Sequence, residues 1–237
     1  MSDQLSPELA AFVAQAPAAR EPHVPFLRAA VEGLAPGSLV LDVGAGEAPY
    51  RELFSAFDYR TTDWAGSFYT PSHGVDYVAP AHDMPLDDDS VDAVVCTQVL
   101  EHVAEPVEVL VELRRVLRPG GRLIVTAPLT WYLHELPHDY YRYTAYGLRH
   151  VLAKAGFAEI DIHPMNDSPS TIGALLREAR WLLGSAETDG LDERRVAAGD
   201  LLAQAATMVE SIGWLDTQWL MPISFSATAR NPQETAG

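Results

Sequence analysis

The sequence predicts an α/β fold built on a doubly wound, mostly parallel sheet. Strand-like and helix-like segments alternate along the 237 residues, an order typical of strands joined by crossover helices. Residues 91–97 (VDAVVCT) form a largely apolar, β-branched run, as expected of a strand buried on both faces of a sheet. The stretch VLDVGAGEAPY at 40–50 passes from an apolar strand into a glycine turn, which is where such sheets bind ligands.

Composition and charge exclude several classes of protein. With 48% hydrophobic and 21% charged residues, the chain can bury a sizeable core as one domain. The formal net charge of −17 opposes binding to nucleic acid or to an anionic membrane surface and favours a small or uncharged partner. The single cysteine, Cys96, excludes an internal disulfide, and its place in an apolar strand predicts a packing role. The sequence starts without a signal core and has no membrane-spanning stretch, so we expect a cytoplasmic protein.

The first part of the chain is expected to contribute four strands. These lie at 38–43, 59–62, 75–79 and 91–97. Helices are expected at 7–15 and 23–34, and a further helix at 47–57 leaves the glycine turn. Residues 64–75, which contain Gly66, Pro71 and Gly74, are expected to form a loop.

The second part is expected to add three strands, at 122–127, 157–163 and 223–229. Pro106 opens a helix with apolar residues on one face, and Pro119-Gly120-Gly121 is expected to be the turn that ends it. Thr144 is expected to cap another helix, which closes at Gly156.

Two amphipathic helices, at 169–183 and 191–213, precede the last strand. We expect them to lie over the sheet as a lid, although their apolar faces suit pairing in a homodimer equally well. The predicted units are a helical cap at 1–36, a core at 37–164, a helical insertion at 165–220, and the last strand with its tail at 221–237.

The glycine turn indicates which ligand fits. Gly44 and Gly46 permit positive φ and a close approach to the backbone. A dinucleotide site would need a third glycine at position 49, where this chain has Pro49. Asp42 precedes the turn and suits a cationic ligand better than an anionic diphosphate. A nicotinamide-dependent oxidoreductase is therefore disfavoured.

Four segments resemble the class I S-adenosylmethionine-dependent methyltransferases, specifically their bacterial branch related to the ubiquinone-type enzymes. In chain order they are VLDVGAG, MPLDDDSVDAVVCTQVLEHV, ELRRVLRPGGRLIVTAP and FSATARNP. The resemblance implies a Rossmann-like, seven-stranded sheet with an antiparallel last strand. It also implies methyl transfer from S-adenosylmethionine to an oxygen, or less often a nitrogen, of a small molecule or saccharide. The alternative is a protein of this fold that binds the cofactor or a partner chain without catalysis.

The resemblance assigns roles around the cofactor. Gly44, Ala45 and Gly46 would lie under its methionine and ribose, and Asp42 would face its ammonium group. Asp63, at the end of the second strand, would accept hydrogen bonds from both ribose hydroxyls, since a carboxylate only accepts. The usual adenine-binding acid falls at Pro80, which leaves Asp83, His82 or a backbone amide as substitutes. The remaining expected cofactor contacts are Trp64, Asp83, Met84, Thr97 and Gln98.

The loop PLTWYLHELPHDYYRYT after the strand at 122–127 is expected to face the acceptor. A general base is useful for a hydroxyl acceptor, and the candidate catalytic residues are His102, His134, His138 and Asp139. The candidate acceptor contacts are Trp131, Tyr132, Tyr140, Tyr141 and Arg142.

A structural role for the same residues remains open. Asp139, Tyr141, Arg142 and Thr144 would then form a hydrogen-bonded helix entrance, with Arg142 paired to a carboxylate instead of holding an acceptor carboxylate or phosphate. Glu101 and His102 would only tie a loop. Because this pair lacks clearly placed partners, the sequence predicts no metal site.

Overall fold

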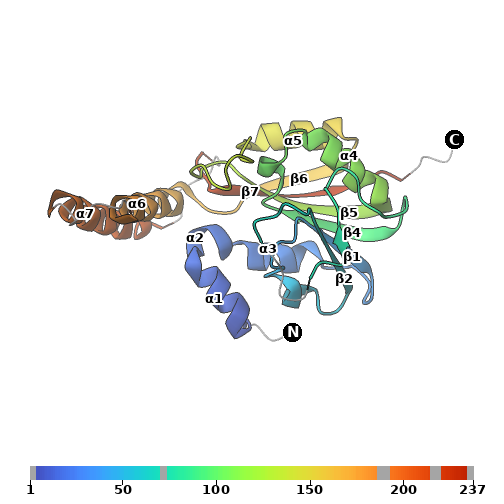
Figure 1. The fold of residues 1–237 in the computed structure, drawn as a ribbon, viewed down its shortest axis with the longest axis horizontal. Helices are drawn as coiled ribbons and strands as arrows, with labels where there is room; N and C mark the ends of the chain where they lie inside the picture. The colour runs from blue at the N-terminus through green and yellow to red at the C-terminus, as the bar shows by residue number, and fades with distance from the viewer. Residues whose placement is uncertain (1–3, 70–73, 186–192, 214–219, 234–237) are drawn as a thin grey trace.

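The computed structural model describes residues 4–69, 74–185, 193–213 and 220–233. Its centre is a seven-stranded sheet in the order β3-β2-β1-β4-β5-β7-β6 (Figure 1). The strands are β1 (Leu39–Val43), β2 (Asp58–Asp63), β3 (Tyr77–Val78), β4 (Val91–Thr97), β5 (Leu117–Pro128), β6 (Ala158–Pro164) and β7 (Ser224–Arg230). Strand β7 runs antiparallel to β5 and β6, while the pairs from β3 to β5 are parallel. The predicted sheet and its antiparallel last strand are confirmed.

Helices cover both faces of this sheet (Figure 1). Helices α4 (Pro106–Val116) and α5 (Ala145–Lys154) pack on one face. Helices α1 (Pro7–Gln15) and α3 (His23–Ala30) pack on the other with the 3₁₀ turn η1 (Arg51–Phe54), and α2 (Pro17–Arg20) joins α1 to α3. Successive side chains of a strand point to opposite faces. The residues facing α3 are accordingly Val40, Ala93 and Val95, and those facing α4 are Leu41, Val94 and Cys96.

The helix predicted at 47–57 is wrong, because only the short turn η1 forms there. Ala48 has a φ of +51°, outside the right-handed helical region. The residue before a proline is disfavoured from that region by the proline ring, and Pro49 follows Ala48. The chain therefore leaves the glycine turn through a second turn, in which the Ala48 amide donates to the Ala45 carbonyl over 2.8 Å.

The Pro119-Gly120-Gly121 stretch lies inside β5 instead of preceding it as a free turn. Val91 of β4 pairs with Leu117, and Ala93 pairs with Arg122, so the residues between Leu117 and Arg122 bulge out of the ladder. The Gly120 amide donates to Asn231 beyond β7 over 2.8 Å. Gly120 has a φ of +78°, which explains why a glycine suits this position.

Helices α6 (Ser168–Ser185) and α7 (Glu193–Glu210) pack against each other and extend away from the sheet (Figure 1). The described residues of the two helices therefore do not lie over the sheet as expected, although Glu178 of α6 lines a cavity at the edge of the sheet. Among the described residues of α7 only Gly199 and Ala206 are buried, so this helix presents no broad apolar face to the sheet. Arg177 of α6 pairs with Glu210 of α7, which ties the two helices together. No helix in the described ranges is long and apolar enough to span a membrane, and the start of the helix expected at 191–213 lies outside those ranges.

Candidate functional site

Two cavities open where β1, β2, β4 and β5 end, which is the edge at which parallel sheets bind ligands. The first cavity, of about 350 Å³, is lined by Asp63, Trp64, His82 and His102, among others. The second cavity, of about 610 Å³, is lined by residues of the N-terminal helices and of the loop after β5. Both cavities are bordered by Gly44, Tyr69, Gln98 and Glu135. They therefore meet beside the glycine turn.

The glycine turn is closed by the backbone of β2. The amides of Gly44 and Ala45 both donate to the Thr62 carbonyl, over 2.9 and 3.1 Å. Gly44 has a φ of +67°, and a Cβ there would lie 2.5 Å from a methyl group of Val99. No larger residue fits this position without moving Val99. Gly44 borders both cavities, while Ala45 and Gly46 line the second.

Asp63 lies at the end of β2, buried beside the first cavity. Its Oδ2 accepts from the Gly46 amide over 2.9 Å and from Ser67 Oγ over 3.1 Å, while its Oδ1 accepts from the Trp64 amide over 2.8 Å. A carboxylate offers about four acceptor positions. Because the described protein donors occupy three of them, the side chain is held rigidly and keeps capacity for a ligand donor at Oδ1.

Asp42 is buried below the glycine turn and does not line either cavity. The Tyr59 hydroxyl donates to its Oδ2. Its Oδ1 is buried without a hydrogen-bond partner among the described residues. Burial raises the pKa of Asp42 to about 7. The carboxyl group therefore lacks a donor on the side away from Tyr59.

The expected adenine contacts Asp83 and Met84 are not at the first cavity. Met84 is part of the core under α4, and its amide donates to Glu112 over 2.8 Å. Asp83 is exposed. Pro80, Ala81 and His82 line the cavity instead, so of the two side chains weighed from the sequence as substitutes His82 lies there and Asp83 does not.

Gln98 occupies the place where the two cavities meet. Its φ is +55°, uncommon for a residue with a side chain. Its amide nitrogen Nε2 donates to Thr126 Oγ1 over 3.0 Å, and its backbone amide donates to the Thr126 carbonyl over 3.0 Å. Thr97 lines only the second cavity.

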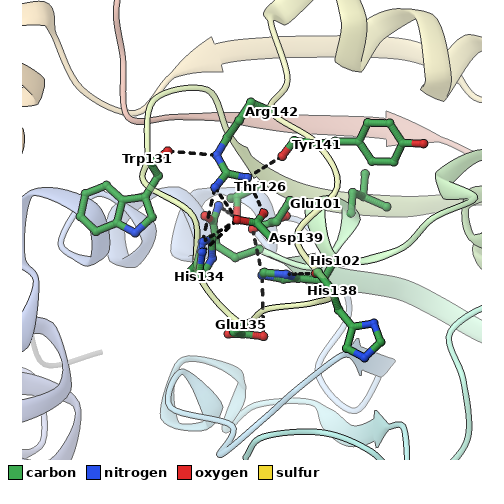
Figure 2. Close-up of polar contacts among 12 residues, drawn as sticks. Glu101, His102, Thr126, Trp131, His134, Glu135, His138, Asp139, Tyr141 and Arg142 are labelled. Carbon is green, nitrogen blue, oxygen red and sulfur yellow. Dashed lines mark hydrogen bonds and ion pairs between the residues drawn. The ribbon is translucent and has the colours of Figure 1, made fainter.

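The loop after β5 is organised around the Asp139–Arg142 pair (Figure 2). The Arg142 guanidinium donates to both carboxylate oxygens of Asp139, over 2.6 and 2.8 Å, and to the carbonyls of Trp131, Tyr132 and Tyr141. The Arg142 guanidinium holds the pKa of Asp139 down at about 2. Neither residue lines either of the two cavities. The geometry therefore gives Arg142 the structural role, in place of the expected contact with an acceptor anion.

The other predicted residues of this loop divide between the two cavities. Trp131, Tyr132 and His134 line the second cavity. His102 and His138 line the first. Tyr140 and Tyr141 line neither, and the Tyr141 hydroxyl donates to the Ala104 carbonyl over 2.8 Å. Thr144 caps α5 as predicted, accepting from the Gly147 amide over 3.0 Å.

Glu101, in the 3₁₀ turn η2 (Leu100–His102), is fully buried beneath this loop. Burial raises the pKa of its carboxyl group to about 8. The rings of His102 and His134 lie edge to face, with centroids 4.7 Å apart. The two histidines, expected from different segments, are thus brought together (Figure 2).

Sequence reasoning missed the part of the second cavity formed by the N-terminal helices. Phe12, Arg20, His23 and Tyr50 line it. His23 is buried and stacks on Tyr50, and its Nε2 lies 3.1 Å from Thr126 Oγ1. Burial lowers the pKa of His23 to about 4, so its ring is neutral at pH 7. The sequence signal was a histidine at the start of a largely apolar helix.

Comparison with known proteins agrees with this geometry. Residues 41–125 match the family model described as a methyltransferase domain. A demethylmenaquinone methyltransferase of Renibacterium salmoninarum is 35% identical over 102 residues, which cover 39% of this chain and 42% of that protein. A human thiol S-methyltransferase is 62% identical over 47 residues, which cover 19% of each chain. The chain thus spans less than half the length of these relatives.

Solved structures extend the likeness over the whole fold. The cyclase SpnF has a TM-score of 0.57 at 23% identity, covering 90% of this chain and 82% of its own. A SAM-dependent methyltransferase from Archaeoglobus fulgidus has a TM-score of 0.55 at 16% identity, covering 93% and 98%. At these identities the likeness establishes the fold alone. The chain therefore has the fold of these structures, and residues 41–125 match the model of a methyltransferase domain.

Proposed function

We propose that this chain transfers a methyl group from S-adenosylmethionine to a small molecule or saccharide. The premise is the match of residues 41–125 to a methyltransferase domain. The acceptor atom is proposed to be an oxygen, and less often a nitrogen. The proposal rests on Asp63, which is held rigidly beside the first cavity. This cavity meets a second one beside the glycine turn. One cavity thus suits the cofactor and the other an acceptor.

The proposed cofactor position follows from the donors and acceptors at the first cavity. One ribose hydroxyl would donate to Asp63, at the acceptor position that its Oδ1 keeps. The adenine would lie against Pro80, Ala81 and His82. The methionine end would reach Gly44 and Gln98, with its ammonium directed toward the carboxyl group of Asp42, directly or through water. The sulfonium would then face the second cavity.

Methyl transfer in this arrangement needs an acceptor placed in line with the methyl group. The acceptor lone pair forms a bond to the methyl carbon, the carbon–sulfur bond breaks, and its electron pair stays on sulfur to give neutral S-adenosylhomocysteine. The acceptor loses its proton to a base. His134 lines the second cavity and His102 lines the first near their junction, so these two rings are the proposed bases. Positioning supplies much of the rate, because the sulfonium is already activated.

The proposed acceptor class follows from the walls of the second cavity. Aromatic rings of Phe12, Tyr50, Trp131 and Tyr132 line it. Such flat apolar faces suit an aromatic ring or the C–H faces of a sugar. The named relatives are a demethylmenaquinone methyltransferase and a thiol S-methyltransferase. Their names support a small-molecule acceptor.

Calorimetric titration with S-adenosylmethionine and S-adenosylhomocysteine tests the proposal. Wild type should bind both, and Asp63→Ala should weaken binding at least about tenfold, or about 1.4 kcal/mol. Asp83→Ala is the matched control, because Asp83 is exposed and lines neither cavity; its affinity should equal that of wild type. Absence of binding of either ligand by folded wild type would overturn the proposal.

A further inference from the structure

The Thr126 hydroxyl joins a buried side chain of α3 to the residue that lies between the two cavities. Thr126 is fully buried in β5. His23 Nε2 lies 3.1 Å from Thr126 Oγ1, and Gln98 Nε2 donates to the same oxygen over 3.0 Å. The three side chains thus form a hydrogen-bonded chain from His23 through Thr126 to Gln98, which lines both cavities.

The His23 ring sets the direction of this chain. Burial lowers its pKa to about 4, so the ring carries one proton at pH 7. Nδ1 makes no close hydrogen bond among the described residues, but the carbonyls of Ala19 and Arg20 act on the ring and raise its pKa. Because a neighbouring carbonyl favours an N–H over a lone pair, the proton belongs on Nδ1. Nε2 then accepts the single proton of the Thr126 hydroxyl.

This direction fixes the orientation of the Gln98 amide. A hydroxyl has one hydrogen and two lone pairs, and the hydrogen of Thr126 is committed to His23. Only a lone pair is left for Gln98, and a lone pair selects the amide nitrogen over the amide oxygen. The oxygen Oε1 is therefore turned away from Thr126, and it has no hydrogen-bond partner among the described residues.

The N-terminal helices hold the His23 ring in place. His23 is 3% exposed and stacks on Tyr50, with ring centroids 5.7 Å apart. Tyr50 in turn meets the edge of Phe12 of α1, with centroids 5.6 Å apart. The Gln98 backbone is held as well, since its amide donates to the Thr126 carbonyl over 3.0 Å. Both ends of the chain are thus anchored.

We propose that His23 is a positioning residue that acts through Thr126 and turns the amide oxygen of Gln98 toward the sulfonium of S-adenosylmethionine. This inference rests on the proposed function, in which the sulfur lies beside Gly44 and Gln98. The negative end of the amide dipole would face the positive charge in a fixed orientation. The sulfur of S-adenosylhomocysteine is neutral and gains nothing from it. The chain should therefore favour the charged cofactor over the product, which helps one replace the other after each turnover.

The ratio of the two dissociation constants, measured by calorimetry, tests the inference. His23→Phe keeps a flat ring against Tyr50 but removes the acceptor for Thr126. The hydroxyl can then donate to Gln98 Oε1, which turns the amide N–H₂ toward the sulfonium. Relative to wild type, the preference for S-adenosylmethionine over S-adenosylhomocysteine should fall about three- to tenfold, as expected for one interaction of hydrogen-bond strength. His23→Gln has an oxygen that can accept from Thr126, so it should keep the wild-type preference.

Further variants separate positioning from a general structural role. Gln98→Leu should lower the preference, and adding His23→Phe to it should change the preference no further, because His23 acts through Gln98. Thr126→Val removes the hydroxyl at nearly constant shape and should also lower the preference, which keeps the test available if His23→Phe does not fold. His150→Phe, at an exposed position of α5, is the matched control and should behave like wild type. Urea unfolding checks that each variant folds, and a loss of stability alone weakens both ligands alike.

The outcomes distinguish this inference from the proposed function. If wild type binds both ligands and folded His23→Phe and Thr126→Val keep the wild-type preference, the positioning role is overturned and the proposed function stands. An equal fall caused by His23→Phe in the Gln98→Leu background also overturns it. If folded wild type binds neither ligand, the proposed function is overturned and this inference with it.

Discussion

Replacing Asp42 by asparagine should stabilise the chain at neutral pH. The side chain is only 4% exposed, and burial raises its pKa from 3.8 to about 7. Between these two values the folded state keeps a proton that the unfolded state has lost. The free energy of unfolding therefore falls as pH rises from about 4 to about 7 and then levels.

The magnitude follows from the pKa difference of about 3. At about 1.4 kcal/mol per pKa unit, the ionised carboxylate lowers the stability of wild type by about 4 kcal/mol above pH 7. Asparagine keeps an oxygen that accepts from the Tyr59 hydroxyl and carries no ionisable group. Asp42→Asn should therefore match wild type near pH 4 and exceed its stability by up to about 4 kcal/mol near pH 8.

Urea unfolding followed by tryptophan fluorescence, at several pH values for both proteins, measures this difference. The comparison with wild type cancels the other titrating groups, which both proteins share. Asp83→Asn, at an exposed position, reports the effect of removing one carboxylate from the surface. A stability difference between Asp42→Asn and wild type that does not change with pH would refute the reasoning.

Two further substitutions test the glycine turn and the loop after β5. Gly44→Ala should lower the free energy of unfolding by about 1–3 kcal/mol and weaken S-adenosylhomocysteine binding, because the added Cβ would meet Val99 and the φ of this residue is +67°. Urea unfolding measures the stability and calorimetry the affinity. Unchanged values would contradict the steric account. Asp139→Asn should cost about 2–3 kcal/mol, since it leaves Arg142 without its charged partner and the pKa of Asp139 lies about 2 below its ordinary value. The pKa of Asp139 is held at about 2, so wild type's advantage is present above about pH 4 and is lost as pH falls through about 2; an equal loss at every pH would contradict the ion-pair explanation.

Local sequence patterns predicted the part of the site that belongs to the sheet. The glycines directly follow β1, and Asp63 is the last residue of β2; the carboxyl ends of parallel strands meet at one edge. Short-range rules also explain one failure, because Pro49 excludes a helix through Ala48. The expectation of a helix after the glycine turn conflicts with this rule.

Contacts between distant segments were beyond the sequence patterns. Nothing in the spacing places His23 of α3 against Thr126 of β5, or His134 beside Glu101. The resemblance places Met84 at the cofactor, yet its apolar side chain packs under α4. The apolar content of α6 and α7 does not show which of their side chains become buried, and on α7 only Gly199 and Ala206 do among the described residues.

A crystal structure of the chain with S-adenosylhomocysteine tests the central claim most directly. A ribose hydroxyl should lie within hydrogen-bond distance of Asp63 Oδ1, and the sulfur should lie beside Gly44 and Gln98, facing the second cavity. Density for the ligand in the second cavity alone, or a ribose that does not contact Asp63, would contradict the proposed division of the site between cofactor and acceptor.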